Sequence, residues 1–263
     1  MRASLSFSLV LFSITASTAL AAVKTEKVEY KDAAGAVLEG VIAYDDAVSG
    51  RRPGVVVVHD WMGISETTEM RVRELALLGY VAFAADIYGK GARPKDGKEA
   101  RALAGKFKGD RKLLRGRAQA ALEALTKDPH VDASKLAAIG FCFGGTTALE
   151  LAKSGAPLKG TVSFHGGLDA VTPGESRNIK GKVLVLHGAD DPHVAAADIA
   201  AFRKDLDDAK VDWTMVQYSG TVHSFTVPTA GSDTSKGSAY NERSSRRAFA
   251  AMKAFFDEIF GAT

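Results

Sequence analysis

The chain has 263 residues, of which 46% are hydrophobic, 25% charged and 8% aromatic, a composition that excludes disordered, collagen-like and coiled-coil classes. Lysine and arginine together number 34 against 31 aspartates and glutamates, for a formal net charge of +3, which is too small an excess to indicate a nucleic-acid-binding surface. The single cysteine, Cys142, excludes an intramolecular disulfide.

The first predicted element is an export signal over residues 1–21. Arg2 gives it a positively charged start, an apolar stretch follows over 5–14, and Ala19 and Ala21 form a small-x-small cleavage pattern. The apolar stretch is shorter than the about 20 residues that span a bilayer; an uncleaved anchor or a disordered tail is the alternative. We therefore expect a periplasmic or secreted protein with a mature domain over 22–263 and no membrane association after cleavage.

Downstream of the signal, apolar β-branched runs alternate with segments of helical periodicity. Strands are predicted at residues 27–30, 37–43, 54–59, 81–85, 136–141, 160–164, 183–187 and 213–218. Helices are predicted at residues 66–78, 98–126 (as a pair), 145–154, 195–209 and 238–260. Continuous runs such as VVVV at 55–58 indicate parallel strands covered on both faces. The pattern predicts a single α/β domain whose mostly parallel, eight-stranded sheet is flanked by helices.

The segment from 90 to 117 is rich in lysine and arginine, with apolar residues at helical spacing. We interpret it as a solvated helix face. The alternative is that its first residues, which follow a strand end, contact an anionic ligand.

The strand predicted at 136–141 leads into the sequence GFCFGG at 140–145, followed by a helical segment. This matches the strand–turn–helix elbow G-x-nucleophile-x-G, with Cys142 where serine is commoner. The flanking glycines relieve crowding between strand and helix, and the helix N-terminus favours a thiolate. The alternative is a small buried cysteine beside a glycine-rich turn.

Two later strands end beside residues that complete a triad. The strand at 183–187 is followed by Asp190 and Asp191, and the strand at 213–218 by His223. Hydrolases with such an elbow carry nucleophile, acid and histidine in this chain order, and the carboxyl ends of parallel strands meet at one edge. The order predicts a Cys142–acid–His223 triad with either aspartate as the acid.

The other histidines that end strands are His59, His165 and His187, which could line a pocket or hydrogen-bond loops. A metal cluster would have to be built from His187, Asp190, Asp191 and His193. That spacing fits no strong ligand motif, so we expect neither a metal nor another cofactor.

The segments GFCFGG, GADDPHV and VHSF together resemble the dienelactone hydrolase family, a cysteine-nucleophile branch of the α/β-hydrolase fold, over residues 27–258. The resemblance implies that Cys142 is the nucleophile, His223 the base and Asp191 the orienting acid. Asp191 fits the family pattern Asp-x-x-Val, which leaves Asp190 as a turn residue. An oxyanion hole from the backbone N–H groups of Phe143 and Trp61 is also implied.

The same resemblance assigns three further positions. Asp60 falls where family members carry an acid that activates the thiol, one methylene shorter than the usual glutamate; a turn cap is the alternative. The founding enzymes hold a substrate carboxylate with two arginines, and Lys90 and Val227 stand at those positions. Lysine keeps a charge but loses the bidentate fork, and Lys90 with its neighbour Tyr88 are the candidate substrate-binding residues.

The resulting hypothesis is a monomeric carboxylic ester hydrolase, similar to carboxymethylenebutenolidase, that cleaves small-molecule esters or lactones through a thioester on Cys142. One alternative is a non-catalytic exported binding protein of the same fold, since a fold does not by itself fix a function. The other is an acyltransferase or a peptidase that uses the same triad.

Overall fold

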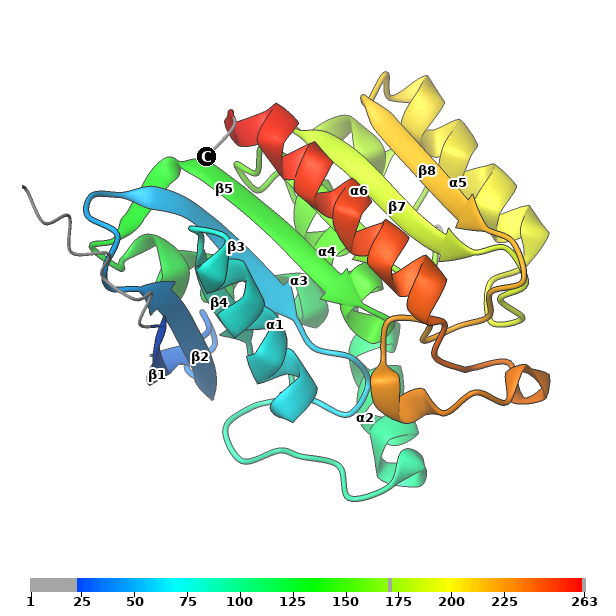
Figure 1. Ribbon diagram of the computed structural model, residues 1–263, viewed down its shortest axis with the longest axis horizontal. Helices are drawn as coiled ribbons and strands as arrows, with labels where there is room; N and C mark the ends of the chain where they lie inside the picture. The colour runs from blue at the N-terminus through cyan, green and yellow to red at the C-terminus, as the bar shows by residue number, and fades with distance from the viewer. Residues whose placement is uncertain (1–22, 170–171, 262–263) are drawn as a thin grey trace, which may run out of the picture.

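The structure is a computed structural model that describes residues 23–169 and 172–261. Within these residues, eight strands form one sheet in the order β1-β2-β4-β3-β5-β6-β7-β8 (Figure 1). The strands are β1 Val23–Lys31, β2 Val37–Asp45, β3 Arg52–Val58, β4 Val81–Ala85, β5 Val131–Phe141, β6 Gly160–Phe164, β7 Lys182–Gly188 and β8 Trp213–Tyr218. The expected export signal at 1–21 lies outside the described residues.

The sheet is mostly parallel, as the sequence predicts. Strands β4, β3, β5, β6, β7 and β8 pair in parallel, whereas β2 pairs antiparallel with both β1 and β4. Strand β1 is longer than predicted, because all nine of its residues pair with β2 although most of its side chains are exposed. Backbone pairing with β2 therefore makes this edge strand longer than its hydrophobic pattern predicts.

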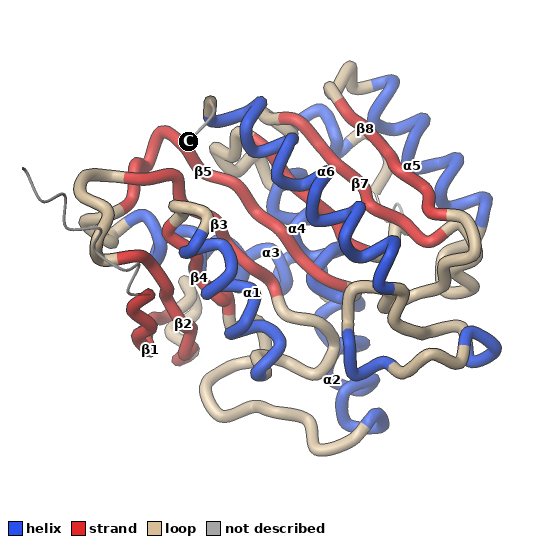
Figure 2. The backbone as a smooth tube through the Cα atoms, in the orientation of Figure 1, coloured by secondary structure: helices blue, strands red, loops and turns tan. Residues whose placement is uncertain are grey.

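Helices cover both faces of the sheet (Figures 1 and 2). They are α1 Glu66–Leu77, α2 Gly97–Gly109, α3 Arg111–Thr126, α4 Phe143–Lys153, α5 Ala196–Asp208 and α6 Glu242–Phe260. In β3, Val55 and Val57 join the core under α1 and α6, whereas Val56 and Val58 join the core under α3 and α4. The unbroken valine run is thus buried on both sides, as expected for a central parallel strand.

Helix α6 begins four residues later than predicted. Its N-terminal cap is Asn241, whose side chain accepts a hydrogen bond from the Ser244 amide. The residues before it pair with the loop after β8 instead, since the Ala239 amide donates to the His223 carbonyl. The prediction was wrong here because tertiary pairing, which the helical periodicity does not reveal, holds this segment extended.

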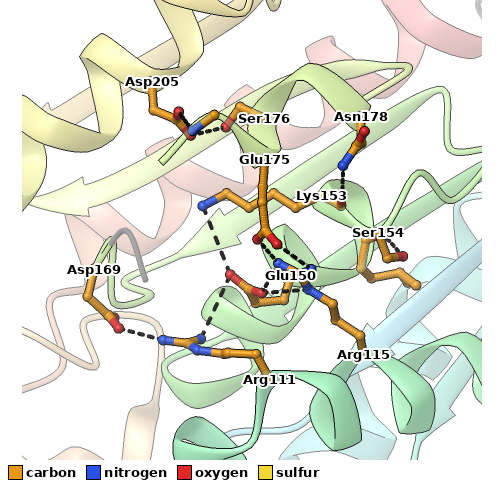
Figure 3. A network of polar contacts seen from close by, with 12 residues as sticks. Arg111, Arg115, Glu150, Lys153, Ser154, Asp169, Glu175, Ser176, Asn178 and Asp205 are labelled. Atoms are coloured by element: carbon orange, nitrogen blue, oxygen red, sulfur yellow. Dashed lines mark hydrogen bonds and ion pairs between the residues drawn. The ribbon is translucent and has the colours of Figure 1, made fainter. Parts of the chain in front are cut away.

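A polar network fastens α4 to its neighbours (Figure 3). The Glu150 carboxylate of α4, 3% exposed, accepts a hydrogen bond from Arg115 Nε of α3 at 2.8 Å. Arg115 also binds Glu175 of the 3-10 helix η1 (Glu175–Asn178), and Arg111 of α3 binds Asp169. These arginines are largely buried, so the interpretation of the whole basic segment as a solvated face was wrong for α3. Buried charges need such partners, and the network holds the helix that follows Cys142.

None of the helices within 23–169 and 172–261 is long and apolar enough to cross a membrane.

Candidate active site

Cys142 lies at a sharp bend between β5 and α4. It has φ 54° and ψ −115°, a backbone conformation that costs a non-glycine residue energy and persists only where its surroundings enforce it. An added Cβ at Gly140 would lie 1.9 Å from the Gly144 carbonyl oxygen, and one at Gly144 would lie 2.3 Å from the Val58 oxygen. The close approach of strand and helix therefore requires glycine at positions 140 and 144.

The structure brings Asp191 and His223 together beside this bend. His223, after β8, is linked through Nδ1 to Asp191 Oδ2 at 2.7 Å, and Asp191 follows β7. The other Asp191 oxygen, Oδ1, accepts the His193 amide at 2.8 Å. Asp190 is exposed. Of the two aspartates that the sequence offers as the acid, Asp191 is the one whose carboxylate contacts His223.

These contacts shift the pKa values of both His223 and Asp191. Burial lowers the pKa of His223, but hydrogen bonds with Asp191 and with the Cys142 thiol outweigh it and raise the pKa to about 10. Burial acts to raise the pKa of Asp191, yet the hydrogen bond from His223 and its positive charge hold that pKa below its usual value. The arrangement favours an imidazolium between a carboxylate and a sulfur.

Cys142 and His223 open onto a pocket of about 710 Å³, a size that suits a small organic molecule. Its lining residues are Asp60, Trp61, Met62, Arg101, Ala104, Gly105, Lys108, Cys142, Phe143, Gly167, His193, Val194, His223, Ser224, Val227, Thr229, Ala230, Lys236 and Ser238. The walls thus come from α2, from the elbow and from the loops after β3, β6, β7 and β8.

Helix α2 supplies a wall that the sequence analysis did not assign. Arg101, Ala104, Gly105 and Lys108 are spaced i, i+3, i+4 and i+7, which places them on one helix face. Among the described residues, neither Arg101 nor Lys108 has a carboxylate within ion-pair distance. The sequence signal that could have found this wall is a pair of small residues between two cations on one face.

The predicted oxyanion-hole residues both line the pocket. Phe143 is the first residue of α4, so its amide lies in the turn where helical N–H groups have no intrahelical acceptor. Trp61 follows β3, and its ring packs against Gly97 at the start of α2. Both amides therefore belong to segments that line the same pocket as Cys142.

Asp60 also lines the pocket, and it acts as a turn cap. Its Oδ1 accepts the Met62 amide at 2.8 Å. Burial raises the pKa of Asp60, while the Met62 amide and the positive charge of His223 oppose that change. Within the described part of the chain, its carboxylate makes no hydrogen bond to Cys142.

The two candidate substrate-binding residues lie outside the pocket lining. Lys90 forms an ion pair at 2.5 Å with Glu29 and lies 3.8 Å from Glu39, on the surface beside β1 and β2. Tyr88 is buried, and its hydroxyl donates to the Trp61 carbonyl at 2.9 Å. Lys90 is thus paired with Glu29 on the surface, and Tyr88 holds the backbone of Trp61. The uncharged Val227 does line the pocket.

The three histidines at strand ends are all buried, and none of them lines the pocket. His59 accepts the Ile87 amide on Nε2 at 3.3 Å, and burial lowers its pKa to about 4. His165 contacts the backbone of Cys142. The described residues contain no group of three or more histidines, cysteines, aspartates or glutamates that could hold a metal ion.

This chain is similar to known proteins in both sequence and structure. Residues 38–260 match the dienelactone hydrolase family. A Yersinia pestis protein, provisionally named carboxymethylenebutenolidase, is 30% identical over 206 residues, covering 73% of this chain and 75% of its own length. A Bradyrhizobium protein, provisionally named 2-oxo-3-(5-oxofuran-2-ylidene)propanoate lactonase, is 30% identical over 68% of this chain and 75% of its own.

Among solved structures, a dienelactone hydrolase-like promiscuous phosphotriesterase from metagenomic libraries superposes with a TM-score of 0.87. It is 45% identical in sequence, and the match covers 91% of this chain and 100% of that one. Several peptidases also superpose, for example a Porphyromonas gingivalis dipeptidyl peptidase at 18% identity and a TM-score of 0.66, which shows likeness of fold alone.

Proposed function

This chain belongs to the dienelactone hydrolase family, and we propose that it hydrolyses small esters or lactones through a Cys142–His223–Asp191 triad and a thioester intermediate. Family membership supports ester or lactone hydrolysis as the reaction class. The proposed triad and thioester rest on one observation: a strained cysteine and a histidine bound to a carboxylate line the same pocket.

In the first step, His223 takes the thiol proton and the Cys142 sulfur attacks the carbonyl carbon. The high pKa of His223 supports this step, because the imidazolium remains charged beside the thiolate. Asp191 holds Nδ1, so that Nε2 is the nitrogen that exchanges protons with the sulfur.

The negative charge that develops on the carbonyl oxygen is assigned to the backbone N–H groups of Phe143 and Trp61. The carbon–oxygen bond to the leaving group then breaks, and His223 donates its proton to the departing alkoxide or enolate. In the second half, His223 removes a proton from water, whose oxygen attacks the thioester. The acid leaves, and the sulfur recovers its proton.

The pocket favours substrates that carry a negatively charged group. Besides His223, three of its lining side chains are cations, namely Arg101, Lys108 and Lys236, against the single lining carboxylate of Asp60. Lys236 forms an ion pair with Asp233 at 3.6 Å, so the two cations of α2 carry the argument. Lys108 Nζ approaches Gly167, since an added Cβ there would lie 3.3 Å from it. We assign to α2 the anion contact that the sequence analysis assigned to Lys90.

A second candidate reaction is the hydrolysis of phosphotriesters. The 45% identical relative is described as a promiscuous phosphotriesterase. The same sulfur could attack phosphorus while the phosphorus–oxygen bond to the leaving group breaks and His223 protonates that group, and water would then hydrolyse the phosphorus–sulfur bond. Paraoxon therefore belongs in the substrate screen beside esters and lactones.

We also propose export, on the basis of residues 1–21 alone. The mature protein recovered from the periplasm or the medium should then begin at Ala22, which mass spectrometry of the intact chain measures. A chain that retains Met1 to Ala21 would contradict cleavage.

The decisive experiment compares wild type with Cys142→Ala on p-nitrophenyl acetate and an enol lactone. We expect Cys142→Ala to lower turnover by about 10³-fold or more while circular dichroism stays unchanged. Mass spectrometry of acid-quenched wild type should detect one acyl group on Cys142. Retained turnover in Cys142→Ala would end the nucleophile assignment.

The same screen separates the alternatives. Wild-type protein that turns over no ester, lactone or phosphotriester would favour the non-catalytic binding protein. Faster cleavage of amides than of esters would favour a peptidase, and acyl transfer to added alcohols over water would favour an acyltransferase.

A further inference from the structure

His165 is a fully buried histidine that the mechanism above does not use. It directly follows β6, is 0% exposed, and has φ 40°. A left-handed backbone at a bulky residue is strained and is kept only where neighbouring contacts determine it. Its amide donates to the Leu186 carbonyl of β7 at 2.8 Å, so its backbone is fixed to the adjacent strand.

The hydrogen bonds of the ring fix its tautomer. The Cys142 amide lies 3.1 Å from His165 Nδ1 and 3.0 Å from the Phe164 carbonyl. A backbone N–H can only donate, so Nδ1 must be the unprotonated acceptor. The proton therefore resides on Nε2, which donates to Thr226 Oγ1 at 2.8 Å. Burial and the nearby charges of His223 and Arg71 hold the pKa of His165 well below its usual value, which agrees with a neutral ring.

Through these two bonds the ring joins the nucleophile to the loop that carries the base. Thr226 is 1% exposed and lies three residues after His223, and its carbonyl accepts a hydrogen bond from Arg71 at 2.8 Å. The His165 ring also contacts the His223 ring edge-on, with centroids 5.1 Å apart. One side chain thus touches both halves of the Cys142–His223 pair.

We propose that His165 is a positioning residue whose neutral ring, bonded to the Cys142 amide and the Thr226 hydroxyl, sets the orientation of the sulfur toward His223. The proposal rests on the proposed function, since it concerns the same pair. His165 exchanges no proton in the reaction, because both of its nitrogens are occupied by structural hydrogen bonds. Its role is to hold the pair at reacting distance.

The test alters the far end of the bridge, where the elbow is untouched. Thr226→Val keeps the shape of the side chain but removes the hydroxyl, and Thr226→Ser keeps the hydroxyl. His165→Asn alters the ring itself and leaves an oxygen able to accept the Cys142 amide. Val183→Ala is the matched control, because it removes buried methyl groups in β7 without contacting the bridge.

The readouts are kcat, KM and the pH profile of Cys142 alkylation by iodoacetamide. We expect Thr226→Val and His165→Asn to lower kcat by about 10- to 100-fold, the effect of slightly misplacing a reacting group, with KM little changed. Their alkylation profiles should move to higher pH than the wild-type profile, and Thr226→Ser should recover most of both properties. Val183→Ala should lower the melting temperature and leave the alkylation profile in place.

Three results would overturn the positioning role. One is Thr226→Val and His165→Asn matching wild type in kcat. Another is a loss of kcat without any shift of the alkylation profile. The third is an alkylation profile that Val183→Ala shifts as far as Thr226→Val does, because this would show that the bridge affects only the overall stability of the fold. Because alkylation needs no substrate, the proposal is tested even if wild type hydrolyses none of the screened esters, an outcome that would count against the proposed function alone.

Discussion

Replacing Asp191 by asparagine should disable the triad while leaving its shape intact. Asp191 Oδ1 accepts the His193 amide, and Oδ2 faces His223 Nδ1 at 2.7 Å. In Asp191→Asn the amide oxygen keeps the His193 contact, so the new NH₂ group points at Nδ1. A donor there forces Nδ1 to act as an acceptor and moves the imidazole proton to Nε2. His223 then cannot take the proton of Cys142.

The size of the effect follows from the charge that Asp191 stabilises. Raising the pKa of His223 from 6.5 to about 10 corresponds to about 5 kcal/mol in favour of the imidazolium, a net value to which Asp191 and Cys142 both contribute. Together with the wrong tautomer, its loss should lower kcat by about 10³- to 10⁴-fold. The assay is steady-state hydrolysis of p-nitrophenyl acetate, and the control is Asp190→Asn, the same charge change at the exposed neighbour.

The reactivity of Cys142 should change with it. Wild-type alkylation by iodoacetamide should be fast at neutral pH, because His223 accepts the thiol proton. In Asp191→Asn the same rate should be reached only at higher pH. An Asp191→Asn protein with the kcat and alkylation profile of wild type would refute the reasoning, because loss of the Asp191 charge would then have no effect on His223 and Cys142.

The same pair links stability to pH. Folding raises the pKa of His223 from 6.5 to about 10, so its contribution is complete below pH 6.5 and is lost as the pH rises through 10. Folding lowers the pKa of Asp191 from 3.8, so that contribution is present above pH 3.8 and is lost as the pH falls through the lowered value. The difference in free energy of unfolding between wild type and Asp191→Asn should therefore be largest between pH 3.8 and 6.5.

Two further predictions concern packing and the pocket wall. Gly140→Ala should lower the free energy of unfolding by about 3 kcal/mol, measured by urea titration, because its Cβ would lie 1.9 Å from the Gly144 oxygen. The control Gly116→Ala has open space around it in α3 and should instead raise the free energy of unfolding by about 1 kcal/mol. Equal effects of the two substitutions would contradict the steric argument. Arg101→Met and Lys108→Met should each lower kcat/KM about threefold for carboxylate-bearing esters but not for their methyl esters, with Lys90→Met as the control that changes neither. Equal losses on both ester classes would remove the anion contact from α2.

Much of the fold is readable from the sequence because central parallel strands are buried on both faces. Runs such as 55–58 have no polar side, and a strand between two helical layers is the structure that tolerates this. The edge of the sheet is less readable. Strand β1 is mostly exposed and is held by pairing with β2, so its hydrophobic pattern predicts only its centre.

The triad candidates were readable for a different reason. Their spacing along the chain reflects the order of strand ends, which topology brings to one edge. Geometry then selects Asp191 over Asp190, because the first is turned toward His223 and the second toward solvent. A one-residue choice of this kind depends on the backbone of a turn, which residue types alone do not specify.

The pocket wall could not be assigned from the sequence. Arg101 and Lys108 form part of a basic, helix-periodic segment in which other cations, such as Arg111 and Arg115, pair with carboxylates. Which helix face meets solvent, a carboxylate or a cavity depends on how α2 docks. Lys90 illustrates the converse, since it lies close to a strand end yet pairs with Glu29 across the edge of the sheet.

Backbone strain in this protein is concentrated at the proposed site. Of the four non-glycine residues with positive φ in the described part of the chain, three surround the pair of sulfur and imidazole: Cys142, His165 and Ser224. Each follows the end of a different strand, and each such residue costs about 1–3 kcal/mol. Glycine would remove that cost at every one of them, but it would also remove a thiol, an imidazole bonded to the nucleophile amide and a pocket-lining hydroxyl. The positions that sequence reasoning would give to glycine carry side chains of the proposed site instead, so local backbone preference alone does not account for the residues at these three strand ends.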